Sequence, residues 1–225
     1  ALCSRAAILR KGDLVGELEA PFNADQMVEM MFGKVITLGE RCNLSCEKYV
    51  LELKDLCIEQ YPLKIENVNF QLHAGEVIGL AGMEGSGQST LLRACAGLIK
   101  SVSGNVIVNG KDLSNKKYHE YLKNGVSFLP ASRLEEGLVP GLNLAEHFTI
   151  VGEEHKGIFI DKEYYQEKAK SLIEDYRIVG RPDLNVESLS GGNQQRLALS
   201  LLKTTLSIIL LEHPTRGLDI ESAIY

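Results

Sequence analysis

The sequence lacks an apolar run long enough to span a membrane, because its longest, around residues 206–211, has the length of a single strand. It also lacks a basic excess: 24 Lys and Arg against 30 Asp and Glu give a net charge of −6, which argues against a nucleic-acid surface. No Cys-x-x-Cys pair occurs among the five cysteines, so reduced thiols are expected rather than disulfides or a metal site. The 225 residues are enough to bury one full domain core with an appendage.

Residues 82–90 have the spacing of a phosphate-binding loop, and the apolar run before them, residues 77–81, predicts a buried strand. The glycines let backbone N–H groups point inward, and a helix beginning near Ser89 adds the positive end of its dipole. A polyphosphate is therefore the expected ligand. The nucleotide-binding residues expected in this loop are Gly82, Met83, Glu84, Gly85, Ser86, Gly87, Gln88, Ser89 and Thr90.

One position departs from this motif, because Gln88 stands where a lysine normally reaches the terminal phosphates. A neutral amide donates a hydrogen bond without carrying charge. Charge-assisted bonds contribute roughly 1.5–3 kcal/mol, against about 1 kcal/mol for neutral ones. We therefore expect weaker nucleotide binding and poorer stabilisation of a phosphoryl-transfer transition state.

Two further motifs follow later in the chain. The string Leu-Ser-Gly-Gly-Asn-Gln-Gln-Arg at residues 189–196 predicts a helix capped by Ser190, whose first turn leaves backbone N–H groups open to an anion. The apolar strand predicted over residues 207–211 ends in Glu212, which fits the strand that supports Mg²⁺ in phosphate-loop ATPases.

Together, these motifs resemble the nucleotide-binding domain of ABC transporters, over about residues 47–225. The strings at residues 189–196 and 214–219, and residues 130–140 in place of the usual glutamine loop, resemble the second nucleotide-binding half of importers for simple sugars and nucleosides. This resemblance implies ATP and Mg²⁺ as cofactors. It implies Ser89 and Glu212 as metal ligands, and Thr90 as a contact to an inner phosphate. The other residues that it implies are His213 beside Glu212 in catalysis, Tyr61 against adenine, Asp219 at a dimer interface, and Ser190, Gly191, Gly192 and Gln194 facing an ATP held by a partner half.

Several positions depart from the family pattern in the same direction. Besides Gln88, a longer carboxylate, Glu212, replaces the magnesium-supporting aspartate, and His213 replaces the glutamate that polarises water. In the glutamine-loop region, Ala131 and Ser132 replace an acidic pair. We therefore expect a degenerate ATP site whose intact signature serves the partner, within an ATPase coupled to solute uptake. The alternative is a non-hydrolytic nucleotide-binding or dimerisation module.

The expected fold is an α/β ABC-type domain with a mixed central sheet, an antiparallel β portion over residues 49–73 and 104–109, and a helical subdomain over 131–190. Residues 1–34, predicted as two strands and a helix, resemble the tail of a preceding homologous half, and 35–46 read as a linker. The resemblance further implies that residues 47–225 stop before the domain's own switch histidine. It implies partnership with the preceding half and with a membrane permease, which would dock near residues 146–152 and hold the protein at the cytoplasmic face of the plasma membrane. The sequence does not indicate the transported solute.

Overall fold

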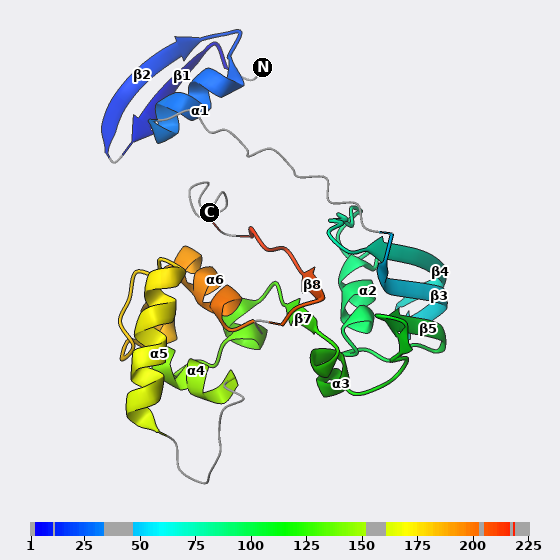
Figure 1. Cartoon of the computed structure of the whole chain (residues 1–225). Coiled ribbons are helices and arrows are strands. Elements are labelled where there is room, and N and C mark those ends of the chain that lie inside the picture. Colours follow the sequence, from blue (N-terminus) through cyan, green and yellow to red (C-terminus); the bar gives the residue numbers. More distant parts are fainter. Residues whose placement is uncertain are drawn as a thin grey trace. The chain divides into compact units, whose positions relative to one another are not determined.

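The computed structural model describes residues 3–10, 12–33, 47–151, 161–202, 205–216 and 218. The chain divides into two compact units, Ala1–Cys42 and Asn43–Tyr225, and Figure 1 shows their elements along the sequence. In the ranges just given, no helix combines the length and the apolar character needed to cross a bilayer.

The first unit contains an antiparallel hairpin and a short helix, as predicted: β1 (Arg5–Arg10), β2 (Asp13–Glu19) and α1 (Ala24–Phe32). The side chain of Asn23 caps α1 by accepting hydrogen bonds from the N–H groups of Asp25 and Gln26. The helix ends at Gly33, whose φ of 73° is the left-handed conformation that glycine adopts without steric cost.

The second unit begins with a four-stranded antiparallel sheet in the order β4-β3-β5-β6. Its strands are β3 (Tyr49–Gln60), β4 (Leu63–His73), β5 (Ser103–Val108) and β6 (Lys111–Asp112). β3 and β4 form the antiparallel portion expected over residues 49–73. The alternation breaks at a register shift near Asp55, whose N–H donates to Asn69 Oδ1 at 3.0 Å and so keeps the two strands paired across the irregularity.

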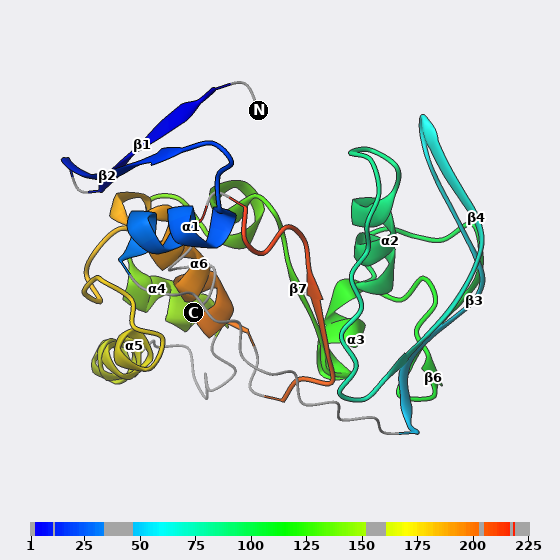
Figure 2. The same cartoon turned by 90° about the horizontal axis from the view of Figure 1, so that it is seen from above.

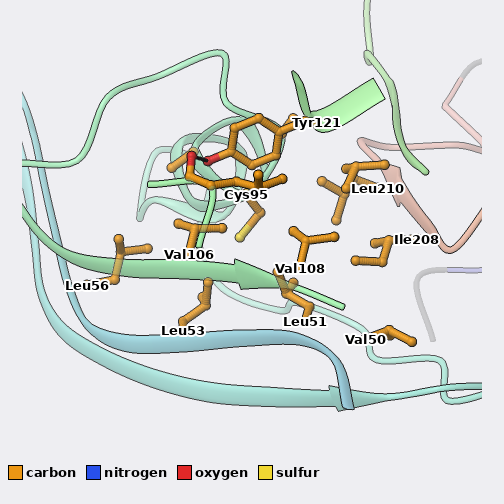
Figure 3. Close-up of a cluster of buried hydrophobic side chains, with 14 of the residues drawn as sticks. Val50, Leu51, Leu53, Leu56, Cys95, Val106, Val108, Tyr121, Ile208 and Leu210 are labelled. Atoms are coloured by element: carbon orange, nitrogen blue, oxygen red, sulfur yellow. Dashed lines mark hydrogen bonds between the residues drawn. The ribbon is translucent and has the colours of Figure 1, made fainter. Parts of the chain in front are cut away.

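One hydrophobic core joins this sheet to the elements around the phosphate loop. Those elements are α2 (Gln88–Cys95), α3 (Tyr118–Lys123) and a parallel pair of strands, β7 (Val126–Leu129) and β8 (Ile208–Leu211). Figure 3 shows side chains from β3, β5, α2, α3 and β8 meeting in this core. The hydroxyl group of Tyr121, buried in this core, donates to the carbonyl oxygen of Leu113 at 2.8 Å (Figure 3). The core therefore holds β8 and α2 in fixed positions beside each other.

The predicted helical portion packs around a second core. It contains the π-helical turn η1 (Arg133–Gly137), α4 (Leu144–Val151), α5 (Lys162–Asp175), the short turn η2 (Val186–Ser188) and α6 (Gly191–Ser200). Both views place α4, α5 and α6 together on one side of the β7–β8 pair, with the antiparallel sheet on the other (Figures 1 and 2). The strand pair thus connects the two cores of this unit.

The structure contradicts the predicted buried strand before the phosphate loop. Residues 77–81 have no strand conformation, and Val77 is 84% exposed. A strand needs a neighbouring strand to accept and donate its ladder hydrogen bonds, and in the described part of the chain β7 and β8 pair only with each other. An apolar pattern alone does not supply that neighbour.

Candidate functional site

The phosphate loop has the backbone that the sequence predicts. Gly85 and Gly87 have φ values of 80° and 112°, which residues with a side chain adopt only under strain. The loop leads directly into α2, and no side chain caps the first turn of this helix. Its N–H groups are therefore oriented toward the loop and can bind an anion.

The side chain of Gln88 curls back into this loop. Its Nε2 donates weakly to the carbonyl of Met83 at 3.4 Å, and its Oε1 accepts from Ser86 Oγ at 3.1 Å. A Cβ atom added to Gly82 would lie 2.2 Å from Gln88 Nε2, so this glycine is what leaves room for the amide. The loop is thus stabilised from within by neutral hydrogen bonds, and no positive charge from this position is offered to a phosphate.

Glu212 follows β8 and lies beside α2, where only 6% of it is exposed. Its Oε2 accepts from Arg93 Nη2 at 2.9 Å and from the N–H of Ala131 at 3.5 Å. Burial by itself would raise the pKa of Glu212, but hydrogen bonds from Ser89 and Arg93 and the charge of Arg93 outweigh it and hold the pKa below its ordinary value. Glu212 is therefore a buried carboxylate with a cationic partner.

The residues expected to hold Mg²⁺ do not fit that ion in this arrangement. Ser89 Oγ accepts from Arg93 Nε at 3.2 Å, and Glu212 Oε2 accepts from the same guanidinium. A guanidinium carries a fixed positive charge, which repels a second cation at the same two oxygens. No group of three or more His, Cys, Asp or Glu side chains suited to a metal occurs within the described ranges.

The helix α6 begins at Ser190, as predicted. Ser190 Oγ accepts from the backbone N–H of Asn193 at 3.4 Å and from its side-chain Nδ2 at 2.9 Å. Gly191 and Gly192 form the first turn with no side chain above their N–H groups. Gln194 is 8% exposed, and its Nε2 donates to two backbone carbonyls, those of Val186 and Leu189, so its amide is engaged in packing.

Arg133 is a residue of this region for which the sequence indicated no role. It lies in η1, after β7, and its guanidinium donates to Gln195 Oε1 at 2.8 Å and to the carbonyl of Gly191 at 3.2 Å. It also donates to the carbonyl of Arg216, in the turn after β8. One side chain therefore connects the loop after β7, the start of α6 and the turn after β8. No sequence signal could have found it, because its partners lie 58 to 83 positions away.

Comparison with known proteins identifies the family of this chain. Residues 65–216 match the protein family described as ABC transporter. The chain belongs to the ABC transporter family. It is 34% identical to the ribose import ATP-binding protein RbsA of Chromobacterium violaceum over 97% of the chain, and 29% identical to the nucleoside import ATP-binding protein NupA of Lactococcus lactis over all of it. It spans 44% and 46% of the lengths of these two relatives, which is less than half of each.

Solved structures agree on the fold of this ABC domain. An ATP-binding cassette of an ABC transporter, MJ1267, superimposes with a TM-score of 0.65 at 23% identity, covering 78% of this chain and 73% of that one. The cassette MJ0796 in a post-hydrolysis dimer bound to ADP and Pi gives a TM-score of 0.62 at 24% identity, covering 76% and 77%. The expected α/β ABC-type fold and the likeness to sugar and nucleoside import proteins are thereby confirmed.

The structure brings only part of the expected ABC site together. Gln88 and Ser89 lie at the start of α2, and Arg93 connects Ser89 to Glu212. Thr90 Oγ1 donates to Gln60 Oε1 at 3.3 Å, an interaction with the end of β3.

Of the other expected residues of the ABC site, Tyr61 and His213 are exposed. Tyr61, expected beside adenine, is 97% exposed in the turn between β3 and β4. His213 is exposed and has a φ of 45°, so its backbone turns away from the strand direction directly after Glu212. Asp219 lies outside the described residues, and its expected place at a dimer interface stays a prediction.

Proposed function

We propose that this chain is one ATP-binding half of an ABC importer for a sugar or nucleoside. Its own phosphate loop holds ATP weakly, and its signature segment, residues 189–196, contacts an ATP held by a partner half. The observation that carries this proposal is the position of Gln88, whose neutral amide lies inside the loop on Met83 and Ser86. ATP entering the loop must displace this amide or accept its single uncharged hydrogen bond.

The chain's own groups define how a polyphosphate is bound. Backbone N–H groups of the loop and of the first turn of α2 donate to phosphate oxygens, and Ser86 Oγ is a further donor once it leaves Met83. The signature offers a second donor set, Ser190 Oγ and the open first turn of α6. In a dimer, this set stabilises the charge on a terminal phosphate of the partner's nucleotide. Mg²⁺ stays part of the proposal as the companion of that partner nucleotide, and no role is assigned to it at Ser89 and Glu212.

The proposed partners are a preceding homologous half and membrane permease subunits, through which the protein associates with the cytoplasmic face of the plasma membrane. Support for the permease contact comes from α4, where Ile150 is 61% exposed and Val151 is 42% exposed. Both side chains are apolar and neighbours at the end of the helix, within the segment expected to dock on the permease. The proposed catalytic role of Glu212, beside His213, requires that Arg93 release the Glu212 carboxylate, which it holds at 2.9 Å.

The test is calorimetric titration of this chain with ATP, for the wild type, Gln88→Lys and the matched control Gln88→Met. Lysine replaces a neutral bond by a charge-assisted one, a gain of about 0.5–2 kcal/mol, which corresponds to about 2- to 30-fold tighter binding. Methionine keeps the length of the side chain and removes its amide, so it should bind no more tightly than the wild type. Micromolar binding by the wild type that lysine does not improve would overturn the weak-site proposal and indicate a working loop.

A further inference from the structure

Arg93, near the phosphate loop, contacts the side chains of Ser89, Glu136, Glu212 and Phe128. It lies on α2 one turn after Ser89, and this i, i+4 spacing places its guanidinium over the serine hydroxyl. From there, Nη2 reaches Glu212 Oε2 at 2.9 Å and Glu136 Oε2 at 2.7 Å. Its Cζ lies 5.4 Å from the centre of the Phe128 ring, a distance at which a cation is attracted to the ring face.

The two carboxylate partners of Arg93 differ in their surroundings. The Glu212 side chain is 7% exposed, whereas that of Glu136 is 42% exposed. A buried carboxylate without a cation is strongly destabilising, while an exposed one is solvated by water. The contact with Glu212 is therefore the one that the fold depends on, and the contact with Glu136 orients the outer side of the guanidinium.

From this geometry we propose that Arg93 is the built-in cation of this site, neutralising Glu212 in place of a divalent metal and excluding that metal from Ser89 and Glu212. A divalent ion coordinated by these oxygens must first break the hydrogen bonds from Nε and Nη2. It must then share the buried site with a positive charge that cannot be titrated away, because arginine stays protonated.

The consequence for nucleotide binding rests on the proposed function. If the loop holds a nucleoside triphosphate, Mg²⁺ finds no free ligand at Ser89 and Glu212, so binding does not depend on Mg²⁺. The affinity of the wild type for ATP in EDTA should then lie within twofold of its affinity in Mg²⁺. In Arg93→Met, the vacated oxygens should favour the metal-bound nucleotide by at least tenfold.

The experiment that decides the proposal needs no nucleotide. Mn²⁺ is titrated into this chain and the free ion is followed by electron paramagnetic resonance, with folding of each variant checked by circular dichroism. We expect Arg93→Met to bind Mn²⁺ at least tenfold more tightly than the wild type. The control Glu136→Gln should not gain Mn²⁺ binding, since it removes the exposed partner and leaves the pair with Glu212 in place.

Two results would overturn the proposal. One is Mn²⁺ binding by the wild type that equals that of Arg93→Met and is lost in Glu212→Gln. The other is a folded Arg93→Met that gains no Mn²⁺ binding. If Arg93→Met does not fold, Arg93→Gln takes its place: glutamine removes the charge and keeps a hydrogen-bond donor. A tighter Mn²⁺ affinity than that of the wild type is then expected, and a folded Arg93→Gln with the wild-type affinity contradicts the proposal. Failure of the chain to bind ATP under any condition would contradict the proposed function. The Mn²⁺ titration would still test the role of Arg93, because it uses no nucleotide.

Discussion

Replacing Arg133 by methionine should loosen the start of α6 without changing the rest of the fold. The guanidinium donates to Gln195 Oε1 and to the carbonyls of Gly191 and Arg216, and methionine fills a similar volume with no donor. The Gln195 side chain belongs to the buried set, at 6% exposed, so its Oε1 would lose its partner away from water.

The expected magnitude follows from these contacts. An unsatisfied buried acceptor costs about 1–3 kcal/mol, and the two partly exposed bonds to carbonyls add about 1 kcal/mol together. The opening free energy of α6 should therefore fall by about 2–4 kcal/mol. Hydrogen exchange of the amides in the later turns of α6 should accelerate at least about 30-fold, since 1.4 kcal/mol corresponds to a factor of ten.

Two controls distinguish the loss of these hydrogen bonds from a nonspecific effect of replacing an arginine. Arg181→Met removes an exposed arginine, 75% exposed and 3.4 Å from Asp183, and should change exchange very little. Adding Gln195→Leu to Arg133→Met removes the unpaired oxygen and should restore part of the protection, which a double-mutant cycle measures. Exchange in α6 of Arg133→Met within threefold of the wild type would refute the reasoning.

Three further predictions concern the core around the phosphate loop. Gly104→Ala should destabilise the protein by at least about 1 kcal/mol more than Gly110→Ala, as measured by urea unfolding. Both glycines have positive φ, but only at Gly104 would an added Cβ lie 2.3 Å from a backbone oxygen. Tyr121→Phe removes one of two donors to the Leu113 carbonyl, which still accepts from the N–H of Lys116 at 3.0 Å, and should cost about 0.5–1.5 kcal/mol in the same assay. Burial raises the pKa of the Cys95 thiol to about 12, so at pH 9 about 0.1% of this thiol is ionised to thiolate. Cys95 should therefore resist alkylation while the exposed Cys3 reacts, which peptide mass spectrometry can measure. Equal rates of alkylation at the two cysteines would contradict this prediction.

Local patterns in the sequence predicted the parts of this protein that depend on neighbouring residues. The helix within residues 1–34, the helix after the phosphate loop and the capped start of α6 at Ser190 were all correct, because the residues that start a helix lie within a few positions of it. The antiparallel pairing of β3 and β4 was also correct. The family followed from the same short motifs.

Long-range contacts decided the rest. The apolar pattern of residues 77–81 predicted a strand, but a strand depends on the hydrogen bonds of its neighbours, which a pattern cannot supply. Likewise, the resemblance to the ABC family implied Ser89 and Glu212 as metal ligands, whereas Arg93 lies 119 positions from Glu212 and meets it only because the core packs α2 beside β8. By itself, the sequence therefore determined the ABC family, the loop and the caps. Only the tertiary structure decided which charges meet, since electrostatic partners are chosen by distance in space.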